Sequence, residues 1–385
     1  MRVLVCPRSF AGTLTAVQAA QAIAAGWSEA APDDEMTLAP LSGGGPGFVG
    51  VVEAALSGMV VATTVADPLG RDVPASLLRV DSGGVRTVYV EAAQAAGLHL
   101  LAAHERDPER TGTYGVGQLV DAALAEGADR IVVGVGGTAT NDAGAGMLAA
   151  LGLEDPALRG GGAALAALGD ESLVGLRELR ARVHGVDLVV AVDDQAPLLG
   201  FSGTSATHAV AKGASPEAAQ RLERALGRFV DVADRALPPA TDLLTGLPRR
   251  PEREPGAGAG GGLAYGLGLL GARRASAVDV VLEACGMDER LARTDLVVTG
   301  EGCFDHASLR DSVVSGVSAA AARRGLPVVV LAGRVEVGRR ESMSIGVAGT
   351  YAVAARPGEV EASMADPVGT LRARARRLAR TWSPR

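Results

Sequence analysis

Short apolar runs and amphipathic stretches alternate along the first part of the chain. The Val-Leu-Val run at 3–5 suits a strand that is buried on both faces of a parallel sheet. Thr15 and Gln18 have the spacing of a capping box, which marks the start of a helix. The predicted elements, in chain order, are a strand at 3–5, a helix at 15–27, a strand at 36–41 and a helix at 48–56. Strand, loop and helix thus occur twice in succession, which is how a doubly wound sheet begins.

The same order of elements returns near the other end of the chain. The predicted elements there are strands at 296–298, 328–331 and 346–353, a helix at 309–324 and a last helix at the C-terminus. We infer that both ends build one discontinuous Rossmann/flavodoxin-like doubly wound α/β domain, residues 1–66 plus 290–385. Ligands of open α/β sheets bind at the carboxyl ends of the strands, so the loops that follow these strands are candidate sites.

The middle of the chain predicts a second, inserted α/β domain over residues 67–289. Strands at 87–91, 131–135 and 188–191 alternate with alanine-rich helices and many glycines. Residues 249–262 combine a Pro/Arg/Glu stretch with Gly-Ala repeats, which fits either a linker or a ligand loop. With two domains predicted, we expect the active site in the cleft between them.

Composition and charge narrow the class of protein and its partners. Hydrophobic residues make up 48% and charged residues 21% of the 385 residues, which is typical of a folded globular protein. The net charge of −7 argues against nucleic acid or an anionic membrane as a partner, and no apolar run is long enough to cross a bilayer. Three scattered cysteines favour a reducing compartment, and the chain opens without a leader-like segment, so we expect a cytoplasmic protein. The oligomeric state stays open.

The strongest chemical signal is a glycine-rich segment directly after the predicted strand at 131–135. It reads Gly-Val-Gly-Gly-Thr-Ala-Thr-Asn-Asp-Ala-Gly over 134–144. Glycines let main-chain N–H groups converge on an anion, and threonine hydroxyls and a helix N-terminus add further donors. A tight strand-to-helix turn with Asn141 or Asp142 as its N-cap explains the segment equally well.

A second glycine-rich segment, 256–261, has the count of a dinucleotide fingerprint but not its context. It follows Pro-Glu-Arg-Glu-Pro rather than a strand, and the chain has no Gly-Lys-Ser/Thr step of a Walker P-loop. We interpret it as a close-packed glycine helix or a substrate loop.

Carboxylates and one lysine supply candidate catalytic groups. Asp193 and Asp194 follow the carboxyl end of the predicted strand at 188–191, where a carboxylate suits a general base or a magnesium ligand. A turn with a capping aspartate is the alternative. Lys212 is the only lysine in the chain, and an ammonium suits the neutralisation of phosphate oxygens, although a Lys-Gly step also fits an exposed helix end.

The segment 299–305 again follows a predicted strand, and it carries Glu301 and Asp305 towards the expected crevice. The five histidines lack the spacing of zinc ligands, and the chain has no G-x-S-x-G elbow of a hydrolase. The sequence therefore argues against a histidine metal site and a serine hydrolase.

Taken in order, these segments resemble the bacterial glycerate kinase family over nearly the whole chain. Residues 7–16 resemble that family's opening Pro-Asp-Ser-Phe-Lys-x-Ser-Leu-Ser-Ala, and residues 134–142 resemble its Gly-Ile-Gly-Gly-Ser-Ala-Thr-Asn-Asp. The other matching pieces are Gly44-Gly45, Asp67-Pro68-Leu69-Gly70, Asp193 with Pro197-Leu198, Lys212-Gly213-Ala214, 255–262 and Thr299-Gly300-Glu301-Gly302. No single piece is decisive, but their collinear order is hard to obtain by chance.

The resemblance implies a two-domain enzyme that phosphorylates D-glycerate with ATP and Mg²⁺, usually to 2-phosphoglycerate. It implies Asp193 and Lys212 as catalytic residues, with Asp193 also meeting the magnesium of Mg-ATP. The implied contacts to ATP and its phosphates are Gly136, Gly137, Thr138, Thr140, Asn141, Gly300 and Glu301. The implied contacts to substrate are Ser9, Gly44, Gly45, Gly258 and Asp305.

Several positions that are charged in the family are changed in this chain. The altered positions are Arg8 for Asp, Ala11 for Lys, Gly43 for Asp, Tyr114 for a cation, Cys303 for Arg and Ser312 for Lys. Phosphoryl transfer depends on positioning and charge neutralisation, so these losses should be costly. They support a second hypothesis, a non-catalytic member that binds a nucleotide or a small hydroxy acid as a sensor or partner.

Overall fold

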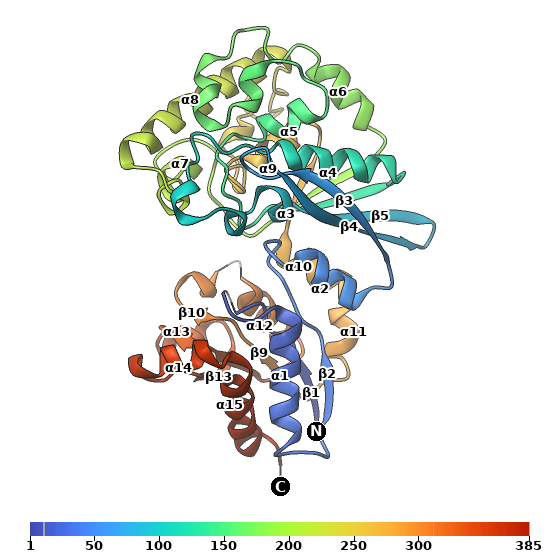
Figure 1. Ribbon diagram of the computed structural model, residues 1–385. Coiled ribbons are helices and arrows are strands. Elements are labelled where there is room, and N and C mark those ends of the chain that lie inside the picture. The colour runs from blue at the N-terminus through green and yellow to red at the C-terminus, as the bar shows by residue number, and fades with distance from the viewer. Residues whose placement is uncertain (11, 311, 385) are drawn as a thin grey trace. The chain divides into compact units, whose positions relative to one another are not determined.

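The structure is a computed structural model that describes residues 1–10, 12–310 and 312–384 (Figure 1). The chain divides into two compact units. The first comprises residues 1–43, 50–57 and 278–385, and the second comprises 44–49 and 58–277. The first unit is therefore built from both ends of the chain. Ala11, one of the altered positions, lies outside the described residues.

The first unit contains a five-stranded sheet in which all neighbouring strands are parallel, in the order β13-β11-β9-β1-β2. The strands are β1 (Arg2–Val5), β2 (Glu35–Leu38), β9 (Leu296–Thr299), β11 (Val328–Ala332) and β13 (Val347–Ala352). The chain adds β2 on one side of β1 and then β9, β11 and β13 on the other. The direction of growth therefore reverses between β1 and β9, which makes this the switch point of the sheet.

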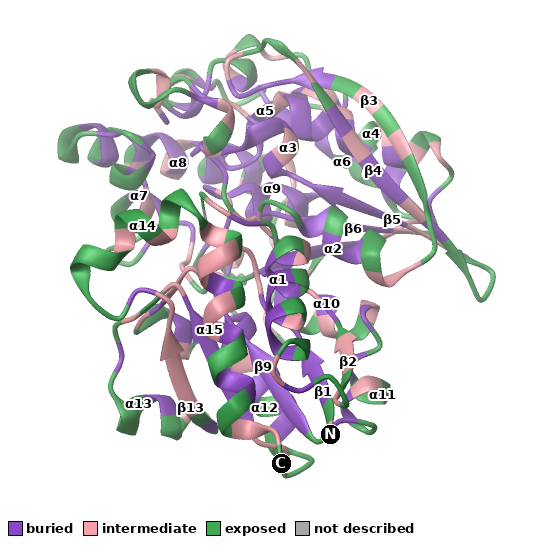
Figure 2. Ribbon diagram, turned by 60° about the horizontal axis from the view of Figure 1, so that its bottom comes forward, coloured by how far each residue is buried: buried purple, intermediate pink, exposed green. Residues whose placement is uncertain are grey.

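Helices cover both faces of this sheet. Side chains alternate between the two faces along each strand, and the central strands are apolar at successive positions, so both faces need cover. Val329 packs in the core with α1 (Ala16–Ser28) and α15 (Pro367–Trp382), whereas its neighbour Val330 packs in the core that includes α12 (Val313–Ala322). Figure 2 shows the central strands buried under these helices. The remaining elements are α11 (Met287–Leu291), α13 (Arg339–Ser344), α14 (Val360–Ala365) and the short parallel pair β10 (Cys303–Phe304) and β12 (Arg334–Val335). The division between the units falls within α2 (Phe48–Ala55) and at the start of α10 (Ala277–Ala284).

The second unit is built on a six-stranded mixed sheet in the order β3-β4-β5-β6-β7-β8. The strands are β3 (Met59–Ala66), β4 (Asp72–Ser82), β5 (Val85–Glu91), β6 (Arg130–Gly134), β7 (Asp187–Val192) and β8 (Arg273–Ser276). β4 is antiparallel to both β3 and β5, and β5 to β8 are parallel. The helices are α3 (Ala93–Ala96), α4 (Tyr114–Ala125), α5 (Ala145–Ala150), α6 (Leu176–Val183), α7 (Thr204–His208), α8 (Pro216–Ala236) and α9 (Leu263–Leu269). The loops after β5, β6, β7 and β8 therefore leave the same edge of the sheet.

The unit boundaries differ from the expected boundaries at 66 and 290. β3 lies in the sheet of the second unit, because it pairs with β4 along its whole length, from Met59 opposite Arg79 to Ala66 opposite Asp72. Residues 278–289 belong to the first unit. Among the described residues, no helix combines the length and the apolar character needed to cross a membrane.

Candidate functional site

The only lysine of the chain lies inside the second unit. Lys212 ends a short 3-10 turn, Val210–Lys212, and its side chain is buried. Its Nζ donates a hydrogen bond to the main-chain oxygen of Thr140, at 2.7 Å, in the glycine-rich loop after β6. Burial lowers the pKa of Lys212 to about 8, and the charges of Asp142 and Asp194 oppose that lowering. The structure thus brings Lys212 to the predicted phosphate loop and rules out an exposed helix end.

Asp142 fastens that loop to the two helices around it. Its carboxylate accepts hydrogen bonds from the N–H and hydroxyl of Thr113, at 2.9 and 2.8 Å, and from the N–H groups of Gly144 and Gly146, each at 3.2 Å. Asp142 is fully buried, and burial raises the pKa of its carboxyl against these hydrogen bonds. The N-cap of α5 is Gly144, so the predicted N-cap at Asn141 or Asp142 is wrong, although Asp142 accepts N–H groups at the start of that helix. The partner Thr113 carried no signal in the sequence.

Several polar side-chain atoms of the same loop are buried without a partner among the described residues. They are Thr138 Oγ1, Thr140 Oγ1 and Asn141 Oδ1, together with the nearby Thr204 Oγ1. The other end of the Asn141 amide donates to Ser205 Oγ at 3.0 Å. Buried polar atoms are nearly always satisfied in native proteins, so a group of unsatisfied ones points to a missing ligand or to water.

The loop Gly44–Val49 packs tightly against the start of the β6 loop. The N–H of Gly136 donates to the oxygen of Gly44 at 3.1 Å, and a Cβ on Gly136 would lie 2.9 Å from Gly45 Cα. A Cβ on Gly137 would lie 2.6 Å from Pro46 Cδ. The structure brings these predicted glycines together, but it uses Gly136 for close approach, so its N–H is already engaged.

The glycine-rich segment before α9 also serves close packing. Gly258 donates its N–H to Ala196 O at 2.9 Å, in the loop after β7. Gly261 has φ +69°, and a Cβ there would lie 1.8 Å from Thr140 O. Only glycine fits such a conformation at so short a distance. The segment therefore holds the loops after β6 and β7 next to each other.

The paired aspartates after β7 have different surroundings. Asp193 is exposed, whereas Asp194 is partly buried and accepts the N–H of Ala196 at 2.9 Å. The second oxygen of Asp194 lies 3.6 Å from His208 Nδ1. Of the two carboxylates, Asp194 is the one whose charge raises the pKa of Lys212. Sequence reasoning ranked Asp193 first, and it missed His208, because adjacent carboxylates look alike in a sequence.

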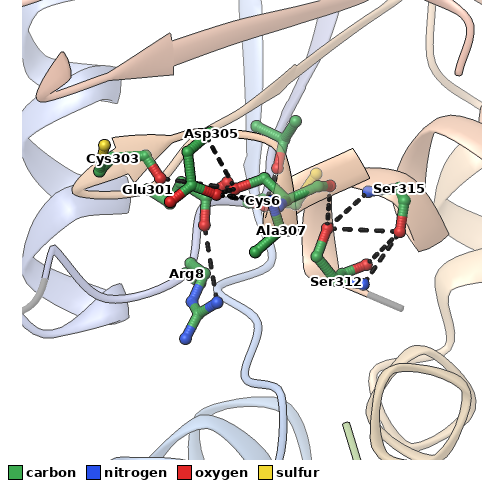
Figure 3. Close-up of polar contacts among 10 residues, drawn as sticks. Cys6, Arg8, Glu301, Cys303, Asp305, Ala307, Ser312 and Ser315 are labelled. Atoms are coloured by element: carbon green, nitrogen blue, oxygen red, sulfur yellow. Dashed lines mark hydrogen bonds and ion pairs between the residues drawn. The ribbon is translucent and has the colours of Figure 1, made fainter. Parts of the chain in front are cut away.

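In the first unit, the predicted residues after β1 and β9 meet at the switch point. Arg8 donates its N–H to Gly300 O at 2.9 Å. Its guanidinium lies 3.5 Å from a carboxylate oxygen of Glu301 (Figure 3). Glu301 is buried, and its other oxygen has no partner among the described residues. Burial raises the pKa of Glu301, while Ser308 and Arg8 act against it.

The predicted substrate residues are divided between the two units. Asp305 forms a turn in which its carboxylate accepts the N–H groups of Ala307 and Ser308, at 2.8 and 3.2 Å (Figure 3). Ser9 is half-buried in the loop after β1. Both lie in the first unit, whereas Gly44, Gly45 and Gly258 lie in the second.

Two of the altered positions have an arginine beside them. The guanidinium of Arg159 stacks 4.5 Å from the centre of the Tyr114 ring and donates to its hydroxyl at 3.2 Å. A cation therefore lies beside Tyr114, the position at which the family resemblance implies a cationic side chain. Cys303 Sγ lies 3.9 Å from a guanidinium nitrogen of Arg334.

Ser312 has a structural role that its sequence position did not reveal. It is the N-cap of α12, where it and Ser315 form a reciprocal capping box, with N–H to Oγ distances of 3.1 and 2.9 Å. Figure 3 shows the two serines facing each other. The expected helix start at 309 moves to Val313, because the cap fixes it there.

Replacing Ser312 with lysine should therefore destabilise the protein by about 1 kcal/mol, the usual cost of a lost N-cap. Thermal unfolding measures this. Ser344→Lys, at an exposed serine at the end of α13, is the matched control and should leave the melting temperature nearly unchanged. Equal melting temperatures for the two variants would contradict the capping role.

Comparisons with known proteins agree over almost the entire chain. The model of the glycerate kinase family matches residues 3–383. Glycerate kinase of Halalkalibacterium halodurans is 33% identical over 98% of this chain and 97% of its own length. Glycerate 2-kinase of Escherichia coli K12 is 36% identical over 87% and 85%, and an uncharacterized protein of Mycobacterium tuberculosis is 38% identical over 96% and 89%.

A solved structure gives the same result for the fold. A Salmonella typhimurium LT2 protein assigned as glycerate kinase 2 superimposes with a TM-score of 0.75 at 33% identity, over 99% of this chain and 98% of its own. The predicted α/β class and the predicted family resemblance are both confirmed.

Proposed function

Because this chain belongs to the glycerate kinase family, we propose that it phosphorylates D-glycerate with ATP and releases 2-phosphoglycerate. One observation carries the proposal most. The only lysine of the chain is held inside the second unit with its ammonium against a glycine-rich loop, next to hydroxyl and amide oxygens that have no partner among the described residues. That arrangement suits an anionic ligand rich in oxygen acceptors.

Lys212 is our candidate for neutralising charge on the transferred phosphoryl group. Below pH 8 its side chain is protonated, and its low solvent exposure strengthens its attraction for an anion. The hydroxyls of Thr138 and Thr140 can donate to phosphate oxygens, because neither is engaged among the described residues. Asn141 is oriented by Ser205 and presents its amide oxygen to the same region.

Asp193 is our candidate for the general base and for the ligand of Mg²⁺. Mg²⁺ is usually held by one or two carboxylates together with substrate phosphates, so one exposed aspartate fits this role. The described residues contain no ready-made group of three or more metal-ligating side chains, which is consistent with a metal that arrives with ATP. When bound, Mg²⁺ would neutralise phosphate oxygens.

In the first unit, Glu301 and Gly300 remain candidates for contacts with ATP, and Ser9 and Asp305 for contacts with the acid. Arg8 adds a positive charge after β1, where the family has a carboxylate. Its ion pair with the buried Glu301 keeps that guanidinium in place. Part of the cationic charge lost at other positions is thus restored here and at Arg159.

The proposal is tested by coupled ADP release with D-glycerate and Mg-ATP, beside a thermal-shift titration with Mg-ATP. Asp193→Asn should lower kcat by about 10²–10⁴-fold, the range for a lost general base. Asp33→Asn, at another exposed aspartate, is the control and should leave kcat unchanged. Stabilisation by Mg-ATP without any ADP release would instead identify a non-catalytic nucleotide sensor.

A further inference from the structure

A cavity of about 440 Å³ lies wholly within the first unit, among residues to which no role has been given. Four of the loops that line it follow strands of the parallel sheet. The lining residues in these connections are Phe10 and Leu14 after β1, Cys303 of β10 after β9, Arg334 of β12 after β11 and Val353 after β13. Val360, Ser363 and Met364 of α14 and the start of α15 complete the wall. Cavities that hold small ligands are roughly 300–1,000 Å³, so this one has the size for an organic ligand.

The position of the cavity agrees with the rule for ligands of open α/β sheets. Such ligands bind outside the carboxyl ends of the strands, at the point where strand order reverses. Here that point lies between β1 and β9, and the cavity is lined from the loops that follow both strands. Gly302, which lines the cavity, is next in the chain to Glu301.

The lining chemistry selects a ligand with a neutral, largely apolar body. Among the lining residues that the structure describes, Arg334 is the only charged one, and its guanidinium is paired with Glu336 at 3.0 Å. No uncompensated cation is therefore present to hold a carboxylate or a phosphate, and burying such an anion unpaired would be costly. Phe10 and the Arg334 guanidinium offer flat surfaces, and the thioether of Met364 adapts to an aromatic ring.

We propose that this cavity binds the nucleoside part of ATP, with the phosphates directed to the loop Gly300-Glu301-Gly302. The inference rests on the proposed use of ATP, and it assigns the base and ribose to the first unit. A planar base fits the flat surfaces just described, and the hydroxyls of Thr13 and Ser363 can meet the polar edges of a nucleoside. D-glycerate, which is small and anionic, does not match this lining.

Cys303 makes the cavity directly observable. It lines the wall and is partly exposed, whereas Cys6 and Cys285 are buried. Burial and Glu336 raise the pKa of the Cys303 thiol, so its alkylation by iodoacetamide is followed in a mildly alkaline buffer. We expect adenosine and ADP, at millimolar concentration, to slow alkylation of Cys303, and pyrophosphate and D-glycerate to leave the rate unchanged. Cys303→Ser removes the reporter signal and identifies the labelled residue.

A pair of substitutions on α14 tests the cavity itself. Ser363→Trp fills it and should weaken ADP binding about tenfold or more. Ala362→Trp places the same side chain on an exposed position of the same helix and should leave ADP binding unchanged. Unchanged alkylation in adenosine, protection by D-glycerate or pyrophosphate instead, or equal ADP affinity in the two tryptophan variants would each overturn the assignment.

The outcome is separable from that of the proposed function. If the protein phosphorylates glycerate but adenosine does not protect Cys303 from alkylation, the nucleoside site is rejected and the kinase proposal is retained. If adenosine protects Cys303 but no glycerate is phosphorylated, the nucleoside site is supported and the kinase proposal is rejected.

Discussion

Lys212→Met should lower kcat/KM for D-glycerate by about 10³-fold or more, the scale on which cationic groups act in phosphoryl transfer. The reason is that Lys212 is the only lysine of the chain and its Nζ donates to Thr140 O in the predicted phosphate loop. Coupled ADP release measures the effect. Lys212→Arg should not restore activity, because a guanidinium is wider than the buried space that an ammonium occupies.

The same substitution should not destabilise the fold. The lowering of the Lys212 pKa from 10.5 to about 8 corresponds to about 3 kcal/mol of unfavourable free energy for keeping the side chain charged. Methionine removes that cost and loses one hydrogen bond, worth about 1 kcal/mol. Urea unfolding at neutral pH should therefore give Lys212→Met a free energy of unfolding equal to or above that of the unaltered chain. A large loss of stability would show that Lys212 is a structural residue.

The pH dependence of activity and of stability should run in opposite directions. Activity should fall as pH rises through about 8, because Lys212 then loses its charge. Between pH 8 and 10.5 the unfolded chain binds more protons at this group than the folded chain does, so its contribution to stability rises with pH. The stability difference between Lys212→Met and the unaltered chain should narrow over the same interval.

Asp142→Ala should destabilise the second unit by about 3–5 kcal/mol, since each buried donor left unpaired costs roughly 1 kcal/mol or more. Its carboxylate satisfies two donors of Thr113 and the N–H groups of Gly144 and Gly146, and both Asp142 and Thr113 are fully buried. Without it, four donors stay buried and unpaired. Because Asp142 also fixes the loop that carries Thr140, glycerate phosphorylation should fall together with stability.

Asp155→Ala is the matched control for that prediction. Asp155 caps a short 3-10 turn through one hydrogen bond, from the N–H of Ala157 at 2.8 Å, so its loss should cost about 1 kcal/mol. Urea unfolding of the two variants gives the comparison. Similar losses for Asp142→Ala and Asp155→Ala would contradict the role of Asp142 as an anchor of several elements.

The buried parallel strands were predictable from the sequence, and the two edge strands of the second unit's sheet, β3 and β8, were not. The strands that are buried on both faces, such as β6 and β11, are nearly continuous apolar runs, and such runs predict buried parallel strands. β3 is largely exposed and mixes threonine with valine, and β8 reads Arg-Arg-Ala-Ser, so neither has a clear period. Their pairing depends on long-range partners, which local pattern does not encode.

The candidate site shows the same limit at the level of side chains. The sequence singled out the Gly134–Asp142 loop and Lys212 as candidate site segments, and the structure joins them through Thr140. The sequence did not reveal that the N–H of Gly136 is already bonded to Gly44 O. Nor did it reveal that the Asp142 carboxylate holds Thr113 through a hydrogen bond. Those roles depend on residues distant in the chain, such as Thr113.

The most direct test follows the phosphorus atoms themselves. ³¹P NMR of Mg-ATP and D-glycerate with the unaltered chain should show loss of the γ-phosphate and growth of a phosphomonoester signal that matches 2-phosphoglycerate. With Lys212→Met, which should fold normally, the ATP signals should persist. Intact ATP in the presence of the unaltered chain, or equal product from both proteins, would contradict phosphoryl transfer at the lysine-bearing loop.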